Sequence, residues 1–109
     1  MNYQWRVVRL GLQDELNNDG VLLQNSIVDV RWKKIATDTD GTSASYLGQT
    51  TLTAKDVPAA NFINFGEVTE AVVLEWVQNS LDSADINRID KALQKKIEKN
   101  RIKTQKPNW

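Results

Sequence analysis

Apolar and polar side chains alternate along the first half of the chain, which is the period-two pattern of half-buried β-strands. Tyr3 and Trp5 alternate with polar neighbours, and Val30 and Trp32 share one face of a second alternating stretch, residues 27–35. Because successive side chains of a strand point to opposite sides of a sheet, we expect the face that carries Trp32 to point inward.

Two glycine-containing turns divide this half of the chain. Residues 17–20 read Asn-Asn-Asp-Gly and residues 38–41 read Asp-Thr-Asp-Gly, and these residue types favour tight turns between antiparallel strands. A third strand is expected within residues 43–53, where Gly48 marks either a bulge or a close approach to Trp32. The pattern therefore predicts an antiparallel meander of three or four strands.

The second half changes to the period of a helix. An aromatic-rich stretch, residues 61–65, is expected to be extended and to lead through Gly66 into a helix that Thr69 caps. Apolar residues then recur at helical spacing, and so does a second stripe after a cap at Asp82. The two stripes are Val73, Trp76, Val77 and Leu81, and Ile86, Ile89, Leu93 and Ile97. The first helix is expected to pack on the sheet through Trp76.

These elements predict the α+β fold class: a three- to four-stranded antiparallel meander followed by two C-terminal helices, the first packed on the sheet. We expect a single domain over residues 1–100 and a basic C-terminal tail over residues 101–109. A chain of 109 residues is large enough for a core of its own.

The composition removes several kinds of chemistry. The chain has no Cys and no His, so a disulfide framework, a thiolate zinc site and the commonest general base are excluded. The first residues lack the apolar region of a signal peptide, and no apolar run approaches the ~18 residues of a membrane span. We expect a soluble, untargeted protein without membrane contact.

Charge is unevenly distributed although the net charge is zero. Residues 1–87 carry twelve acidic and six basic side chains, whereas residues 88–109 carry eight basic and two acidic ones. A basic end can bind nucleic acid or an acidic protein, but cations also suit the last turns of a helix. We favour the helical explanation and expect no nucleic-acid partner, because a DNA-binding domain is usually basic overall.

The acidic residues form no convincing catalytic or metal-binding set. Asp38 and Asp40 next to Gly41 resemble the start of a calcium loop, but the third ligand and the closing Glu are missing, so a hairpin turn is the better interpretation. Glu70 and Glu75 alternate with the apolar stripe and are expected to face water. We predict no catalytic residue, no metal site and no cofactor.

Tryptophan is frequent, with four in the chain. Three of them, Trp5, Trp32 and Trp76, lie on apolar faces and are expected in the core between sheet and helix. Trp109 has no periodic context, so it is either disordered or an anchor for a neighbouring chain or for its own domain. The residues expected to contact a partner are Lys95, Lys99, Arg101, Lys103, Lys106, Pro107 and Trp109.

The same layout of residues resembles a small protein family of tailed bacteriophages, particularly phages of marine and freshwater cyanobacteria. The resemblance spans nearly the whole chain, from an early strand Trp and a Val-x-Trp strand to a Trp-Val helix and a Pro-x-Trp end. It rests on Trp5, Val30, Trp32, Asp40, Gly41, Phe62, Ile63, Phe65, Thr69, Glu70, Trp76, Val77, Leu93, Ile97, Pro107 and Trp109. These are scaffold residues, and the resemblance implies a virion or structural-accessory role.

We therefore expect a non-catalytic phage protein that acts through protein–protein contacts, as a small virion component such as a capsid decoration or a head or tail accessory. Two alternatives stay open: an early phage protein that binds and modulates a host protein, and a nucleic-acid-binding accessory that uses the basic C-terminal helix. The expected partners are virion subunits or a host protein, with a homo-oligomer as one arrangement. The expected location is the phage virion or the host cytoplasm.

Overall fold

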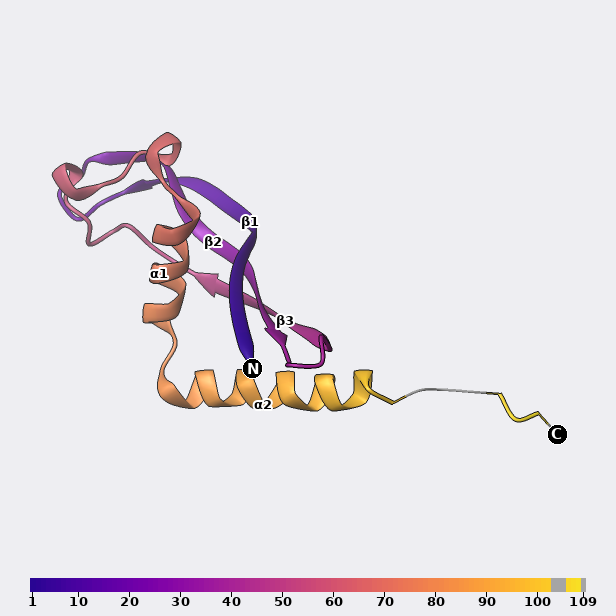
Figure 1. Cartoon of the computed structure of the whole chain (residues 1–109). Helices are drawn as coiled ribbons and strands as arrows, with labels where there is room; N and C mark the ends of the chain where they lie inside the picture. The colour runs from indigo at the N-terminus through magenta and orange to yellow at the C-terminus, as the bar shows by residue number, and fades with distance from the viewer. Residues whose placement is uncertain (103–105, 109) are drawn as a thin grey trace.

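The computed structural model describes residues 1–102 and 106–108, and its elements are a three-stranded sheet, two 3-10 turns and two helices (Figure 1). The elements are β1 (Asn2–Leu16), β2 (Leu22–Thr37), β3 (Ser43–Thr51), η1 (Ala59–Asn61), η2 (Phe65–Glu67), α1 (Glu70–Ser80) and α2 (Ser83–Asn100). The predicted α+β fold class, with three strands, is confirmed, and so is the packing of the first helix on the sheet.

The strands form an antiparallel meander in the order β1-β2-β3. Both turns reverse the chain through a glycine in the left-handed region, since Gly20 has a φ of 75° and Gly41 a φ of 85°. The register of β1 on β2 shifts three times along β1, whereas β3 pairs with β2 without a shift. These irregularities bend the long β1–β2 hairpin, whose far end curls over α1 in Figure 1.

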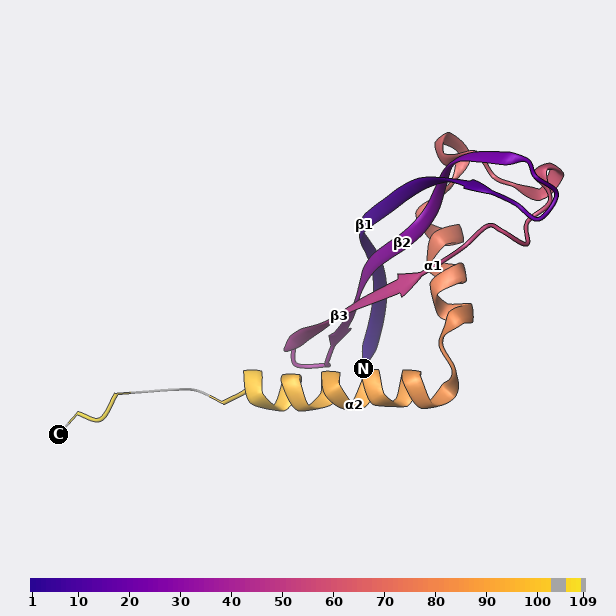
Figure 2. The same ribbon diagram turned by 180° about the vertical axis from the view of Figure 1, so that it is seen from behind.

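The core lies between the inner face of the sheet and the two helices. The buried apolar side chains of this cluster are Ile27, Val30, Trp32, Ala36, Ala44, Val73, Val77, Ile89, Leu93 and Ile97. Helix α2 crosses under the end of the sheet near β3, and α1 runs beside β1 (Figures 1 and 2). The predicted stripes of both helices therefore do face the sheet, with Val73, Val77, Ile89, Leu93 and Ile97 as their buried members.

Trp32 is the centre of the sheet's inner face. Its indole lies directly over Gly48, where an added Cβ would come within 2.2 Å of the ring, so the close approach is the correct reading of this glycine. The indole Nε1 donates a hydrogen bond to Thr50 Oγ1 at 3.0 Å, and the ring of Trp5 stands 5.1 Å away between centroids. Only glycine fits opposite Trp32.

Both predicted helix starts are present. The Thr69 hydroxyl accepts from the amide of Val72, and the side chains of Asp82 and Asp85 form a reciprocal capping box at the start of α2. Helix α2 is also tied to the sheet by Lys34, a buried cation whose Nζ lies 2.6 Å from Asp90 Oδ1.

Two local expectations were wrong. Residues 61–65 do not form an extended run, because they connect η1 to η2 and include parts of both turns. Trp76 is only half-buried, since its ring borders an open groove instead of meeting Trp5 and Trp32 in the core. The apolar face of α1 is thus wider than the part of it that packs on the sheet, which buries Val73 and Val77.

Candidate protein-interaction groove

The far part of the β1–β2 hairpin and the connection from β3 to α1 form one unit, which we call the distal lobe and define as residues 11–29 and 52–68. The lobe occupies the upper left of Figure 1, at the end of the sheet opposite α2. Few of its side chains reach the core, so other contacts must hold it together.

Asn17 fastens the hairpin turn to the opposite loop. Its side-chain oxygen accepts from the amides of Asp19 and Val21 at 3.0 and 2.9 Å, and its Nδ2 donates to Val57 O at 3.0 Å. The neighbouring amide of Asn18 donates to Lys55 O at 2.8 Å. Because Asn17 is 6% exposed, these bonds are shielded from competing water.

Glu15 makes a second tie between the same segments. One carboxylate oxygen accepts from the Ser26 hydroxyl at 2.8 Å and from the Ala54 amide at 3.1 Å, and the other accepts from the Thr53 hydroxyl at 2.9 Å. Burial disfavours the charged form, but the hydrogen bonds from Ser26, Ala54 and Thr53 outweigh it and hold the pKa of Glu15 below its ordinary value. The ionised carboxylate of Glu15 therefore joins β1 to Ser26 of β2 and to residues 53–54 after β3.

A groove of about 720 Å³ opens between this lobe and α1. Its walls come from residues 25–27 of β2, from residues 52–65 after β3, and from the exposed side of α1 at Trp76, Asn79 and Ser80. The large apolar side chains in its lining are Ile27, Leu52, Val57, Phe62, Ile63, Phe65, Val68 and Trp76. This volume falls within the range of about 300–1,000 Å³ that is usual for ligand sites.

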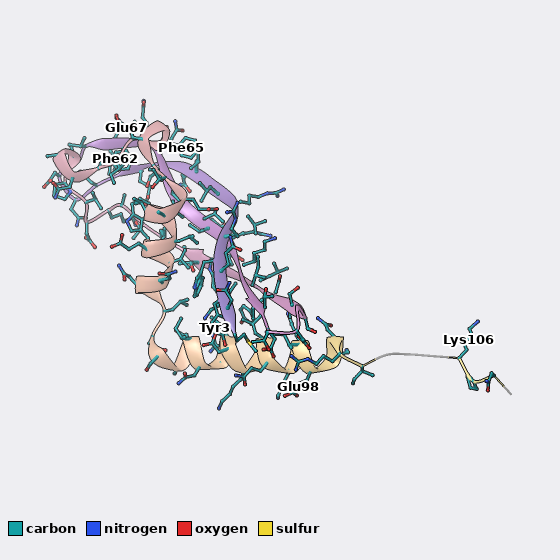
Figure 3. The ribbon with its side chains drawn as sticks, viewed as in Figure 1. Tyr3, Phe62, Phe65, Glu67, Glu98 and Lys106 are labelled. Atoms are coloured by element: carbon teal, nitrogen blue, oxygen red, sulfur yellow. The ribbon has the colours of Figure 1, made fainter. Side chains whose placement is uncertain are left out.

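Large apolar side chains are also exposed elsewhere in the distal lobe. Of the eleven that are exposed among residues 1–102 and 106–108, six belong to the lobe: Leu12, Leu16, Val21, Leu22, Ile63 and Phe65. Figure 3 shows Phe62 and Phe65 close together at the top of the lobe, next to Glu67. An exposed apolar cluster beside an apolar groove is typical of a surface that another molecule covers.

The sheet's outer face has a different chemistry. The register places Arg6 opposite Lys33 and Arg9 opposite Arg31, so like charges face each other across the strands. Glu70 lies 3.5 Å from Arg6, and Asp29 lies 3.8 Å from Arg31. The aromatic side chains of β1 and β2 lie on the inner face of the sheet, as expected. The basic outer face therefore has no aromatic rings from these strands on which nucleic-acid bases could stack.

The described residues among those predicted to contact a partner lie on α2 and on the chain beyond it, and none of them lines the groove. Lys95 and Lys99 are exposed on α2, and Lys95 shares the solvent side of the helix with Arg88 and Lys91. Lys106 and Pro107 are exposed beyond the helix. Lys103 and Trp109 lie outside the described residues.

Arg101 is committed to its own domain. Its guanidinium pairs with Asp38 and lies 2.9 Å from Asp40 Oδ2, so the turn between β2 and β3 receives the end of α2. The hydrogen bond from Arg101, joined by bonds from Thr42, lowers the pKa of Asp40 to about 2. The Asp-x-Asp-Gly sequence is therefore a turn that binds a cation of the same chain, an arginine.

Across residues 1–102 and 106–108, no group of three or more Asp, Glu, His or Cys side chains is placed to hold a metal ion. Neither described helix is both long and apolar enough to cross a membrane.

The whole chain, residues 1–109, matches the model of a protein family described as a domain of unknown function, DUF7936. The chain belongs to this family. No curated protein and no solved structure matches it.

Sequence reasoning missed the groove in this DUF7936 domain. Glu15 and Asn17 looked like a strand residue and a turn residue, because their partners, Val57 and Ala54 among them, lie about forty positions away. One signal was available: three large apolar residues, Phe62, Ile63 and Phe65, follow Pro58 in a stretch with neither helical nor strand periodicity. Apolar residues that share no face of a helix or strand are candidates for a binding surface instead of the core.

Proposed function

We propose that the protein is a non-catalytic interaction protein whose distal groove binds another protein subunit, and that it serves as a small virion component of a tailed phage, such as a capsid decoration or a head or tail accessory. The groove and the six exposed apolar residues of the distal lobe carry the first part of the proposal. The resemblance to tailed-phage proteins supports the second part.

The polar ties support a binding role for the lobe. Side chains of Glu15 and Asn17 join the end of the β1–β2 hairpin to residues 53–57, which form part of the groove wall, so this wall is fixed before any partner arrives. A preformed surface binds more tightly because less conformational entropy is lost on association. The exposed apolar side chains contribute little to folding, since they remain in water.

The test compares two matched substitutions in the full chain. Ile63→Lys places a charge in the groove lining, and Leu47→Lys places the same charge on β3, where Leu47 is 72% exposed and away from the groove. Both variants should melt within a few degrees of the wild type. In phage that encode them, Ile63→Lys should be missing from purified virions by mass spectrometry, whereas Leu47→Lys should be present.

The same experiment separates the alternatives. A wild-type protein that is absent from purified virions but abundant in infected cells would contradict the virion role and favour binding to a host protein. Normal incorporation of Ile63→Lys would show that the groove is not the contact surface.

A further inference from the structure

We propose that the groove receives residues 102–109 of a second copy of this chain, so that copies join head to tail. We call these residues the C-terminal segment. The inference rests on the proposed function, because it names the partner of the same groove.

The chemistry of the segment suits the groove. The segment contains Lys103 and Lys106 and no acidic residue, whereas residues 1–87 carry twelve acidic and six basic side chains. The groove lining has one charged residue, Asp56, and an otherwise apolar or uncharged surface. Pro107 and Trp109 supply apolar groups, and Trp is among the residues that most often dominate binding energy.

The place where the segment leaves the domain argues against its own groove as the destination. Arg101 is held by Asp38 and Asp40, and Asn100 Nδ2 donates to Ser43 O at 2.9 Å, so the segment starts at the first residue of β3. The groove begins at Leu52, just beyond the last residue of β3. Figure 2 shows these two ends of the molecule well apart.

The lengths sharpen this argument. Strand β3 has nine residues, so its ends are about 27 Å apart. The stretch from Ile102 to Trp109, fully extended, spans at most about 29 Å. A segment that returned to its own groove would arrive taut at the edge, with no length left to enter. The groove of a second copy has no such limit.

This contact would join two different surfaces, the groove of one copy and the segment of the next. Such heterologous contacts do not close on themselves in a dimer, so they build rings or open filaments. Each copy would offer one free groove and one free segment at the ends of an open assembly.

The experiment uses two full-length variants with complementary defects. Trp109→Ala keeps the groove and loses the anchor, and Ile63→Lys keeps the anchor and loses the groove. In sedimentation velocity, the wild type should form species that grow with concentration, and each variant alone should stay monomeric. An equimolar mixture should form a dimer and nothing larger, because only one intact groove and one intact anchor can meet. Leu47→Lys should behave as the wild type.

A second measurement uses a labelled peptide with the sequence of residues 102–109. It should bind the full-length Trp109→Ala protein by fluorescence anisotropy, and its Trp109→Ala counterpart should bind at least tenfold more weakly. A monomeric wild type at hundreds of micromolar, or a mixture of the variants that stays monomeric, would overturn the inference. If the inference fails while Ile63→Lys is still lost from virions, the groove binds a different protein and the proposed function stands.

Discussion

The two ends of the sheet combine apolar packing and polar contacts in different proportions. Near α2 apolar packing dominates, and Val30, Leu93 and Val77 are fully buried. In the distal lobe Leu23 and Ile27 are buried, the side chains of Glu15 and Asn17 add polar ties, and six large apolar side chains remain in water. The distal lobe therefore relies more on polar ties and leaves more apolar surface exposed.

This contrast explains why a groove can stay open in so small a protein. A loop held by apolar packing would collapse into a gap of this size, because apolar side chains move to cover one another. Hydrogen bonds are directional, so the ties from Asn17 and Glu15 hold residues 53–57 against the hairpin and keep this wall of the groove in place. The apolar lining is left for a partner.

The largest expected effect is in the core. Leu93→Ala should lower the free energy of unfolding by about 2–5 kcal/mol, because it removes a fully buried side chain and leaves a cavity between α2 and the sheet. Urea denaturation followed by circular dichroism measures it. A loss below about 1 kcal/mol would mean that α2 is not part of the cooperative core.

A smaller effect is expected at the polar tie. Glu15→Ala leaves the Ser26 hydroxyl and the Ala54 amide without their acceptor and should destabilise the protein by about 1–3 kcal/mol. Glu75→Ala, an exposed position on α1, is the matched control and should be nearly neutral. Equal melting temperatures for the two variants would show that the tie does not hold the lobe.

Acid should act on both ends. The folded-state pKa values of Glu15 and Asp40 are lowered, so each carboxylate contributes stability that is present above its unfolded pKa, near 4.5 and 3.8, and is lost as the pH falls towards the folded value. Melting temperature should therefore fall below pH about 4.5. Glu15→Gln should flatten the first part of that decline. An unchanged profile would contradict the role of Glu15.

The ion pairs of Arg101 with Asp38 and Asp40 at the end of α2 should affect the last turn of this helix more than the stability of the whole protein. Its side chains are exposed, so Arg101→Met should change the overall melting temperature little. The last turn of α2 should lose protection in hydrogen exchange, and the effect should be mimicked by high salt. Retained protection in the variant would show that Lys96 and Asn100, which bond Ser45 O and Ser43 O, suffice to hold the helix end.

The smallest effect has the opposite sign. Arg9→Glu turns a like-charge pair with Arg31 into an attractive one and should stabilise the protein by about 0.2–1 kcal/mol. Thermal melting at low salt measures it, with Arg9→Gln as a control that removes the like charge without adding an attractive one. A loss of stability would mean that Arg9 makes a contact on which the fold depends.

Local patterns predicted most of this fold because each strand and helix carries its own periodic apolar face. Alternation marked the strands, helical spacing marked Ile89, Leu93 and Ile97, and the caps at Thr69 and Asp82 marked the helix starts. Trp76 was misplaced because a stripe says which side of a helix faces the protein, not how far the sheet extends beneath it.

The candidate site was beyond such patterns. The groove wall depends on hydrogen bonds between residues 15–18 and 53–57. Neither stretch contains a sequence pattern that predicts contact with the other. The sequence showed the charge of Arg101, but its pairing with the turn at Asp38 and Asp40 could be seen only in the folded chain.

The central claim is that the groove is formed in the free protein by polar ties. Hydrogen exchange of the monomeric Trp109→Ala protein tests it most directly, through the amides of Asn18 and Ala54, which donate to Lys55 O and Glu15 Oε1. Both amides should exchange at least a hundredfold more slowly than in an unstructured peptide, though faster than amides of the core strand β2. Exchange at unprotected rates would contradict the claim, because the lobe would then be open until a partner closed it.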